Sequence, residues 1–185
     1  MFFDQREFDI RCEWGEPGVA ALAPISDAVI IVDVLSFSTS VEIAARNGAL
    51  VFPYRWRDDR AVGFAAAVQA VLAEPRRTVG SYSLSPASLL DIQPGTRLVL
   101  PWPNGATLTL AARPTPVFVG CLRNAAAVAA AARQLGPKIA VIAAGERWPG
   151  DHSLRPCVED PIGAGQSSVG FGFGYRAPVV ADRLS

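Results

Sequence analysis

The sequence has little lysine, histidine or cysteine, and it carries no net charge. Its 17 basic and 17 acidic residues balance, and Lys138 is its only lysine. A protein that binds nucleic acid through bulk charge needs a clustered excess of Lys and Arg, so this class of partner is not expected. The three cysteines, Cys12, Cys121 and Cys157, form no CxxC pair and no Cys/His ligand spacing. A disulfide framework and a structural zinc site are therefore disfavoured.

Long apolar runs are missing as well. No stretch approaches the roughly 18 uncharged apolar residues of a membrane span. The N-terminal segment MFFDQREFDIRCEWG contains acids and arginines where a signal peptide would need an apolar core. The Walker A, GxSxG and HExxH motifs are also absent, which argues against P-loop kinases, α/β-hydrolases and zinc proteases. We expect a soluble, cytoplasmic protein with no membrane partner.

Short β-branched runs alternate with alanine-rich amphipathic runs along the chain. Hydrophobic residues make up 50% of its 185 residues, enough for one core. Strands are expected at 8–14 (an edge strand), 28–35, 49–54, 97–100, 116–120 and 139–144. Helices are expected at 38–46, 58–72, 104–112 and 123–135, with a short helix after Ser85-Pro86 and another that begins near Pro161. This alternation predicts an α/β fold: a mostly parallel sheet with helices on both faces, in three layers. We assign residues 1–166 to one domain and 167–185 to an atypical tail rich in glycine and aromatic residues.

Ligands of open parallel sheets bind beyond the carboxyl ends of the strands, which directs attention to four loops. In the first loop, Asp33 ends the most hydrophobic run, where a buried carboxylate needs a metal, an arginine or backbone donors. Ser38, Thr39 and Ser40 follow where a helix begins, and a helix N-terminus favours anions. Asp33 is therefore a candidate Mg²⁺ ligand or nucleophile, and the three hydroxyls are candidates for phosphate binding. The alternative is that Ser38 only caps the helix while Asp33 pairs with an arginine.

The second and third loops carry polar residues directly after strands. Asn104-Gly105 forms a tight turn into a helix, where the Asn104 amide either caps the helix or contacts a bound anion. Arg123 offers a bidentate donor suited to phosphate, sulfonate or carboxylate. The alternative is a solvated Arg123 beside Asn124 as a helix cap. Cys121 is expected to pack in the core.

The fourth loop is the richest in charge. Arg147 follows the strand at 139–144, and the pair Glu159-Asp160 precedes Pro161 in the first turn of a helix. Mg²⁺ is usually held by one or two carboxylates with waters and substrate oxygens, so this pair is a candidate metal site. Helix capping is the alternative, although it needs only one of the two acids. His152, the only histidine, is expected to be an ordinary surface residue.

Seven segments in order give the chain a family resemblance: DVLSFSTS, NGALVFPY, LSPASL, LVLPWPNGA, VFVGCLRNAAAVA, VIAAGERW and VEDPIGAG. Over residues 31–166 they resemble the 2-phosphosulfolactate phosphatase family. Members of that family are α/β proteins that use Mg²⁺ to hydrolyse the phosphate ester of 2-phospho-3-sulfolactate, a step towards coenzyme M. The resemblance matches Asp33 to the acid of the family's DVLRAT-type motif, and Asn104 with Gly105 to its TNG turn. It matches Asn124 to the start of the family's NA helix, and Glu159 with Asp160 to its ED pair.

The chain also departs from the family pattern. Ser36 stands where the family's motif has an arginine, which removes an anion contact, and PWPNGA replaces TTTNGT, which removes hydroxyls beside Asn104. The interpretation that combines residues and resemblance is a Mg²⁺-dependent phosphoric monoester hydrolase with a small anionic phosphoester substrate. Arg123 or Arg147 would neutralise a second acidic group of that substrate. The alternative is a non-catalytic binder of phosphorylated or sulfonated metabolites, and exposed edge strands are compatible with a homodimer. The expected substrate-binding residues are Ser36, Ser38, Thr39, Ser40, Asn104, Gly105, Arg123, Asn124 and Arg147.

Overall fold

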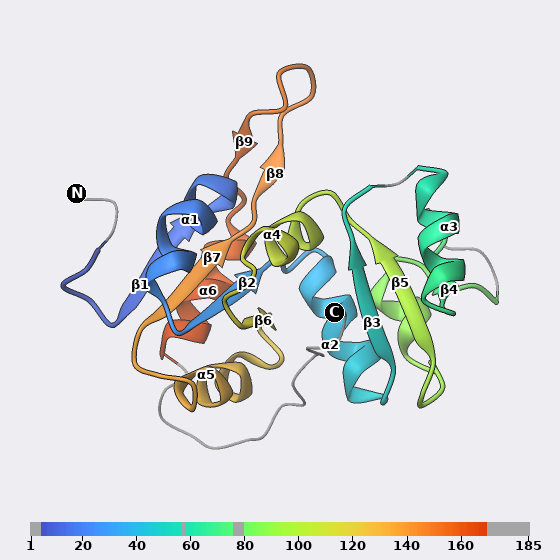
Figure 1. Cartoon of the computed structure of the whole chain (residues 1–185), viewed down its shortest axis with the longest axis horizontal. Coiled ribbons are helices and arrows are strands. Elements are labelled where there is room, and N and C mark those ends of the chain that lie inside the picture. Colours follow the sequence, from blue (N-terminus) through green and yellow to red (C-terminus); the bar gives the residue numbers. More distant parts are fainter. Residues whose placement is uncertain (1–4, 57, 76–79, 170–185) are drawn as a thin grey trace.

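The computed structural model describes residues 5–56, 58–75 and 80–169, and its strands form two parallel sheets and one small hairpin (Figure 1). The larger sheet has the order β1-β7-β2-β6, and every neighbouring pair is parallel. Its strands are β1 (Ile10–Trp14), β7 (Ile139–Ala143), β2 (Ala28–Val32) and β6 (Val117–Gly120). The smaller sheet has the order β3-β5-β4, also parallel. Its strands are β3 (Leu50–Tyr54), β5 (Arg97–Pro101) and β4 (Val71–Leu72).

The larger sheet is covered by helices on both faces. Every residue of β2 is buried, and alternate side chains point to opposite faces. Val29 and Ile31 share a core with α1 (Gly15–Leu22) and with Leu108 of α4 (Gly105–Ala111). On the other face, Ile30 packs with α5 (Ala125–Arg133) and α6 (Glu159–Val169). The predicted α/β fold with a mostly parallel sheet between two helical layers is confirmed.

The smaller sheet is joined to the larger one through α2 (Phe37–Arg46), which lies between them in Figure 1. Val41 and Ile43 of α2 share a core with Val51 of β3 and Leu98 of β5. Val119 of β6 packs against the same core from the larger sheet. The residues at the start of α2 are therefore held from both sides, which fixes the loop that precedes it.

Two sequence predictions about element boundaries are wrong. The helix expected at 58–72 ends early: α3 covers Arg60–Ala67, Gln69 adopts φ 51°, and Val71–Leu72 form β4 against β5. Pairing with the edge of β5 outweighs the local helical pattern there. The strand expected at 28–35 ends at Val32 because side chains take the next two backbone N–H groups. The Asp33 N–H donates to Ser38 Oγ, and the Val34 N–H donates to Asp160 Oδ1.

The remaining elements agree with the predictions to within a few residues or were not predicted. The short helix after Ser85-Pro86 is present at Pro86–Leu89. Helix α1, the 3-10 turn Ala23–Ile25 and the hairpin of β8 (Glu146–Arg147) and β9 (Leu154–Arg155) were not predicted. The first residues of the expected tail, 167–169, form the last turn of α6, and 170–185 lie outside the described residues. Among the helices of the described ranges, none has the length and apolar character to cross a bilayer.

Candidate functional site

Two buried aspartates lie where loops from three strands of the molecule converge. Asp33 directly follows β2, and Asp160 lies in the first turn of α6; their exposed fractions are 4% and 3%. Asp160 links two of the loops through its oxygens. Oδ1 accepts the N–H of Val34 at 2.8 Å, and Oδ2 accepts the N–H of Gly145, beyond β7, at 2.8 Å. Asp160 of the ED pair therefore connects the start of α6 to the loops after β2 and β7.

The carboxylate of Asp33 is held by N–H groups from two loops. Its Oδ2 accepts the indole Nε1–H of Trp102 at 2.7 Å and the backbone N–H of Gly105 at 2.9 Å. Its Oδ1 accepts only a longer bond, 3.3 Å, from the N–H of Phe37, among the hydrogen bonds of the described residues. Because a carboxylate oxygen has two acceptor positions, Oδ1 is the atom with more capacity left for a cation or a phosphorus atom.

Burial and neighbouring negative charges raise the pKa values of both aspartates. Burial is the main cause that raises the pKa of Asp33 to about 7, and the charge of Asp160 adds to the rise. Burial also raises the pKa of Asp160, against the opposing N–H bonds from Val34 and Gly145. Burial of two carboxylates of like charge favours protonation of one of them or the binding of a cation. The pair is electrostatically strained when both members are ionised.

Gly105 occupies a position that only glycine fits. A Cβ atom built on it would lie 2.8 Å from Asp33 Oδ2 and would overlap the ring of Phe37. This close approach is what allows the Gly105 N–H to reach Asp33. The Asn-Gly turn predicted after β5 thus acts on Asp33 through its backbone.

Asn104, at the N-cap position of α4, makes no capping hydrogen bond with its side chain. Its Nδ2 instead donates to Oε2 of Glu146 at 2.8 Å. Glu146 is half-buried and is the first residue of β8, directly after Gly145. The loops after β5 and β7 are therefore connected by side chains as well as through the two aspartates.

The buried hydroxyls after Asp33 bond to backbone groups. Ser38 Oγ accepts the N–H of Asp33 at 2.9 Å and lies 3.4 Å from the carbonyl oxygen of Ile31. Ser40 Oγ donates to the carbonyl oxygen of Leu84 at 2.6 Å. Both serines have no exposed surface. They fix the shape of the Asp33 loop through bonds to backbone groups and do not face solvent.

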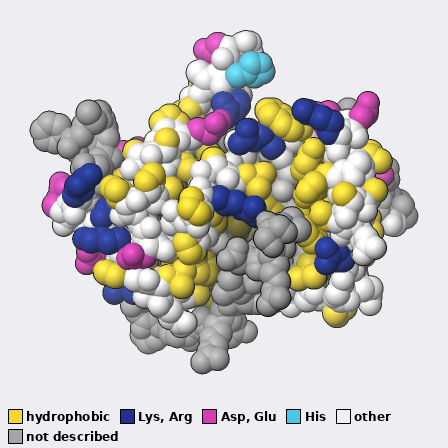
Figure 2. Space-filling view, viewed as in Figure 1, with side chains coloured by type: hydrophobic (Ala, Val, Ile, Leu, Met, Phe, Trp, Pro, Cys, Tyr) yellow, Lys and Arg dark blue, Asp and Glu magenta, His cyan; other side chains and the backbone are white. Residues whose placement is uncertain are grey.

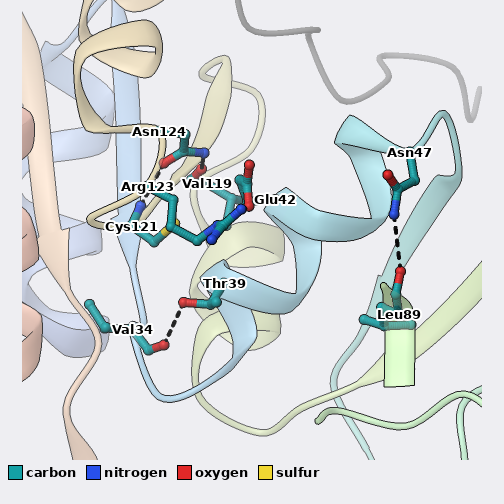
Figure 3. A network of polar contacts seen from close by, with 9 residues as sticks. All are labelled: Val34, Thr39, Glu42, Asn47, Leu89, Val119, Cys121, Arg123 and Asn124. Atoms are coloured by element: carbon teal, nitrogen blue, oxygen red, sulfur yellow. Dashed lines mark hydrogen bonds and ion pairs between the residues drawn. The ribbon is translucent and has the colours of Figure 1, made fainter. Parts of the chain in front are cut away.

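The two remaining hydroxyl residues of this loop are only partly buried. Ser36 Oγ donates to Leu84 O at 3.2 Å. Thr39 Oγ1 donates to Val34 O at 2.8 Å, as Figure 3 shows. Of the four hydroxyls predicted to bind phosphate, Ser36 and Thr39 are the two within reach of solvent.

Arg123 and Asn124, in the loop after β6, are both engaged (Figure 3). Arg123 Nε contacts Glu42 Oε2 of α2 at 2.7 Å, and 44% of the Arg123 side chain is exposed. The amide of Asn124 braces its own turn: Oδ1 accepts the N–H of Cys121, and Nδ2 donates to the carbonyl of Val119. Cys121 is fully buried, as predicted.

Arg147 lies in the β8–β9 hairpin, which stands out from the body of the molecule (Figure 1, Figure 2). It forms an ion pair with Glu16 of α1 and donates to the carbonyl oxygen of His152. His152 is exposed, in agreement with the prediction. Glu159 is half-buried and adjoins Asp160 at the start of α6.

Two residues of the site were missed by reasoning from sequence: Trp102, which bonds to Asp33, and Glu146, which bonds to Asn104. The signal for both was the position directly after a parallel strand. The loops after β2, β5 and β7 do converge at Asp33 and Asp160, but neither side chain was singled out within its loop.

A separate cavity of about 240 Å³ lies between α3, β4 and β5. Its lining includes three carboxylates, Asp58, Asp59 and Glu74, together with Leu84 and Pro101. Three acidic side chains disfavour a phosphate group. The loops around Asp33 and Asp160 also carry carboxylates, and their N–H groups already bond to the two aspartates, so a phosphate group would need a cation beside it to bind there.

The donor atoms near these aspartates suit a hard cation. Asp33, Asp160 and the neighbouring Glu159 offer carboxylate oxygens, the ligands that Mg²⁺ prefers. Within residues 5–56, 58–75 and 80–169 no group of three or more His, Cys, Asp and Glu side chains is placed so that it could hold a metal ion. Any Mg²⁺ here would therefore rely on waters and substrate oxygens for most of its coordination.

A family model described as 2-phosphosulpholactate phosphatase matches residues 19–167 of the 185-residue chain. The matched range contains all the loops described above, including Asp33, Asn104, Glu146 and Asp160. A comparison with curated proteins gives no significant match.

Proposed function

The chain belongs to the 2-phosphosulfolactate phosphatase family, and we propose that it hydrolyses the phosphate ester of a small acidic metabolite of this type with the help of Mg²⁺. The observation that carries the proposal is the buried Asp33–Asp160 pair beyond the end of β2. A structural role alone does not call for two mutually repelling carboxylates in one buried place.

Mg²⁺ is the cofactor that the pair would take. Asp33, through Oδ1, and Asp160 would hold it, with Glu159 beside them. When bound, the ion would neutralise charge on the phosphoryl oxygens. The raised pKa of each aspartate supports this role. A bound cation would replace the proton on the carboxylate and would offset the repulsion between the negative charges.

Asp33 is the residue that we place at the reacting phosphorus. The N–H groups of Trp102 and Gly105 fix Oδ2 and so orient Oδ1. Two roles suit this geometry: a metal ligand, or a nucleophile that forms an aspartyl phosphate, expels the alcohol and is released by water. An acid-quenched reaction followed by mass spectrometry of the peptide that contains Asp33 distinguishes them, because only the nucleophile becomes phosphorylated.

The remaining predicted residues divide by their environment. Ser36, Thr39 and Asn104 are the partly exposed side chains that would contact the phosphate, while Ser38 and Ser40 hold the loop. Arg123 would bind the second acidic group of the substrate. Its Nε bonds to Glu42, and its guanidinium carries further N–H donors for that group.

The test is phosphate release from 2-phosphosulfolactate, with Mg²⁺ and with EDTA, by the wild type, Asp33→Asn and the control Asp91→Asn. Asp91 is an exposed aspartate in the segment between the helix Pro86–Leu89 and β5, outside the loops that hold Asp33 and Asp160. We expect release that requires Mg²⁺, falls on the order of a thousandfold in Asp33→Asn, and is unchanged in the control. A folded wild type that is stabilised by phosphate or sulfonate ligands but releases no phosphate would instead be a binding protein.

A further inference from the structure

Glu146 is a fourth carboxylate close to the site, after Asp33, Asp160 and Glu159, and the function proposed so far gives it no task. Its Oε2 accepts Nδ2–H of Asn104 at 2.8 Å. Its negative charge raises the pKa of Asp160, which means that it adds to the repulsion at the aspartate pair. A neutral side chain could accept the same bond without this cost. The presence of an acid therefore calls for an explanation beyond packing.

A carboxylate has a property that a neutral partner lacks: it only accepts hydrogen bonds. An amide that faces it must present its NH₂ group, so the rotation of the Asn104 side chain is fixed and its Oδ1 points elsewhere. A bond to a charged acceptor is also stronger than one between neutral groups. Asn104 has no competing capping bond that would hold it in another way.

The connection continues along the backbone on both sides. Next to Asn104, the Gly105 N–H donates to Asp33, and next to Glu146, the Gly145 N–H donates to Asp160. The Asn104–Glu146 bond thus closes a ring of contacts between the loops after β5 and β7 and both aspartates. Gly145 adopts φ 65°, and a Cβ atom there would lie 2.8 Å from the Leu154 side chain. The hairpin of β8 and β9 therefore packs closely against the turn at Gly145.

We propose that Glu146 is a positioning residue: it holds the Asn104 amide so that the second Nδ2–H can donate to the phosphate group, and it keeps the Asn104-Gly105 turn on Asp33. This role rests on the phosphatase function proposed above. Glu146 acts through Asn104 and does not touch the substrate itself. Its effect should therefore vanish when Asn104 is absent.

A double-mutant cycle tests this dependence. Phosphate release is measured for the wild type, Glu146→Ala, Asn104→Ala and the double variant. We expect kcat/KM to fall about 10–100-fold in either single variant and no further in the double variant. Glu146→Gln can accept the bond through its amide oxygen but can also donate, so it no longer fixes the rotation of Asn104 and should recover only part of the activity lost in Glu146→Ala. Melting temperatures of all variants identify any that fail to fold.

The outcomes separate the two proposals. Wild-type activity with an unimpaired Glu146→Ala, or single losses that multiply in the double variant, would overturn the positioning role and leave the phosphatase intact. A wild type that releases no phosphate would overturn the phosphatase. Calorimetric binding of inorganic phosphate would then test the role of Glu146 separately. Equal weakening of phosphate binding in Glu146→Ala, Asn104→Ala and the double variant supports the positioning role. Unchanged phosphate binding in Glu146→Ala refutes it.

Discussion

The charges of this protein are satisfied in two different ways in neighbouring regions. Around the ends of β2 and β7, Asp33 and Asp160 are buried, accept N–H bonds and repel each other. At the periphery, Arg123 and Arg147 are more than two-fifths exposed and each is paired with a glutamate. Buried carboxylates with raised pKa values are typical of functional sites. Solvent-exposed ion pairs contribute little to the free energy of unfolding.

The largest expected effect is on the pH dependence of stability. The folded-state pKa of Asp33, about 7, lies above its ordinary value of 3.8. Its contribution to stability is therefore fully present below pH 4 and is lost as the pH rises through 7, by about 4 kcal/mol. Urea unfolding in EDTA should show this decline for the wild type and a much flatter curve for Asp33→Asn. The same pH dependence of the unfolding free energy in both proteins would contradict the raised pKa of Asp33.

A methyl group at Gly105 should damage the site directly. Because the added Cβ would crowd Asp33 Oδ2 and Phe37, Gly105→Ala should lose about 1–3 kcal/mol of unfolding free energy and most of the phosphatase activity. The matched control is Gly63→Ala in α3, where a Cβ meets nothing within 4 Å. That change should stabilise the protein by about 0.5–1 kcal/mol. Similar effects at both positions would count against the close approach.

Asp160→Asn should destabilise the protein more than Asp33→Asn does at pH 6. An amide can accept only one of the two N–H bonds from Val34 and Gly145. The other buried donor would be left without an acceptor, which costs about 1–3 kcal/mol. Asparagine at position 33 can keep both bonds to Oδ2 and loses only the 3.3 Å contact. Chemical denaturation of the two variants side by side measures the difference, and a more stable Asp160→Asn would be the opposing result.

The smallest effect is expected at the periphery. Arg123→Ala removes the ion pair with Glu42, whose side chain is only 10% exposed, and should lower the unfolding free energy by about 1 kcal/mol. Its effect should appear instead as a raised KM for a substrate with a second acidic group. A stability loss above about 2 kcal/mol in urea titrations would show that this pair is structural.

The layers of the fold could be predicted because their signals are local. The fully apolar runs of β2 and β7, alternating with alanine-rich helices, dictate a buried parallel sheet. Helix α1 was missed because its sequence, GEPGVAAL, contains two glycines and a proline and has poor helical propensity. Strand β4 was missed because its extended form depends on pairing with β5, a contact that the local pattern does not contain.

The site could be located by loop but not by contact. The rule for carboxyl ends of parallel strands correctly indicated the loops that hold Asp33, Asn104 and Asp160. The bonds from Trp102 to Asp33 and from Asn104 to Glu146 join residues 69 and 42 positions apart, and only tertiary structure reveals them. The same applies to Ser38, whose hydroxyl faces the backbone of its own loop.

The most direct test of the strained aspartate pair is a calorimetric titration with Mg²⁺ at pH 8, on the wild type, Asp33→Asn and Asp160→Asn. The buried pair should bind Mg²⁺ in the wild type, and the ion should raise the melting temperature. Both substitutions should abolish the heat of binding and the stabilisation. Wild-type affinity for Mg²⁺ in either variant would contradict the assignment of the cation to these two aspartates.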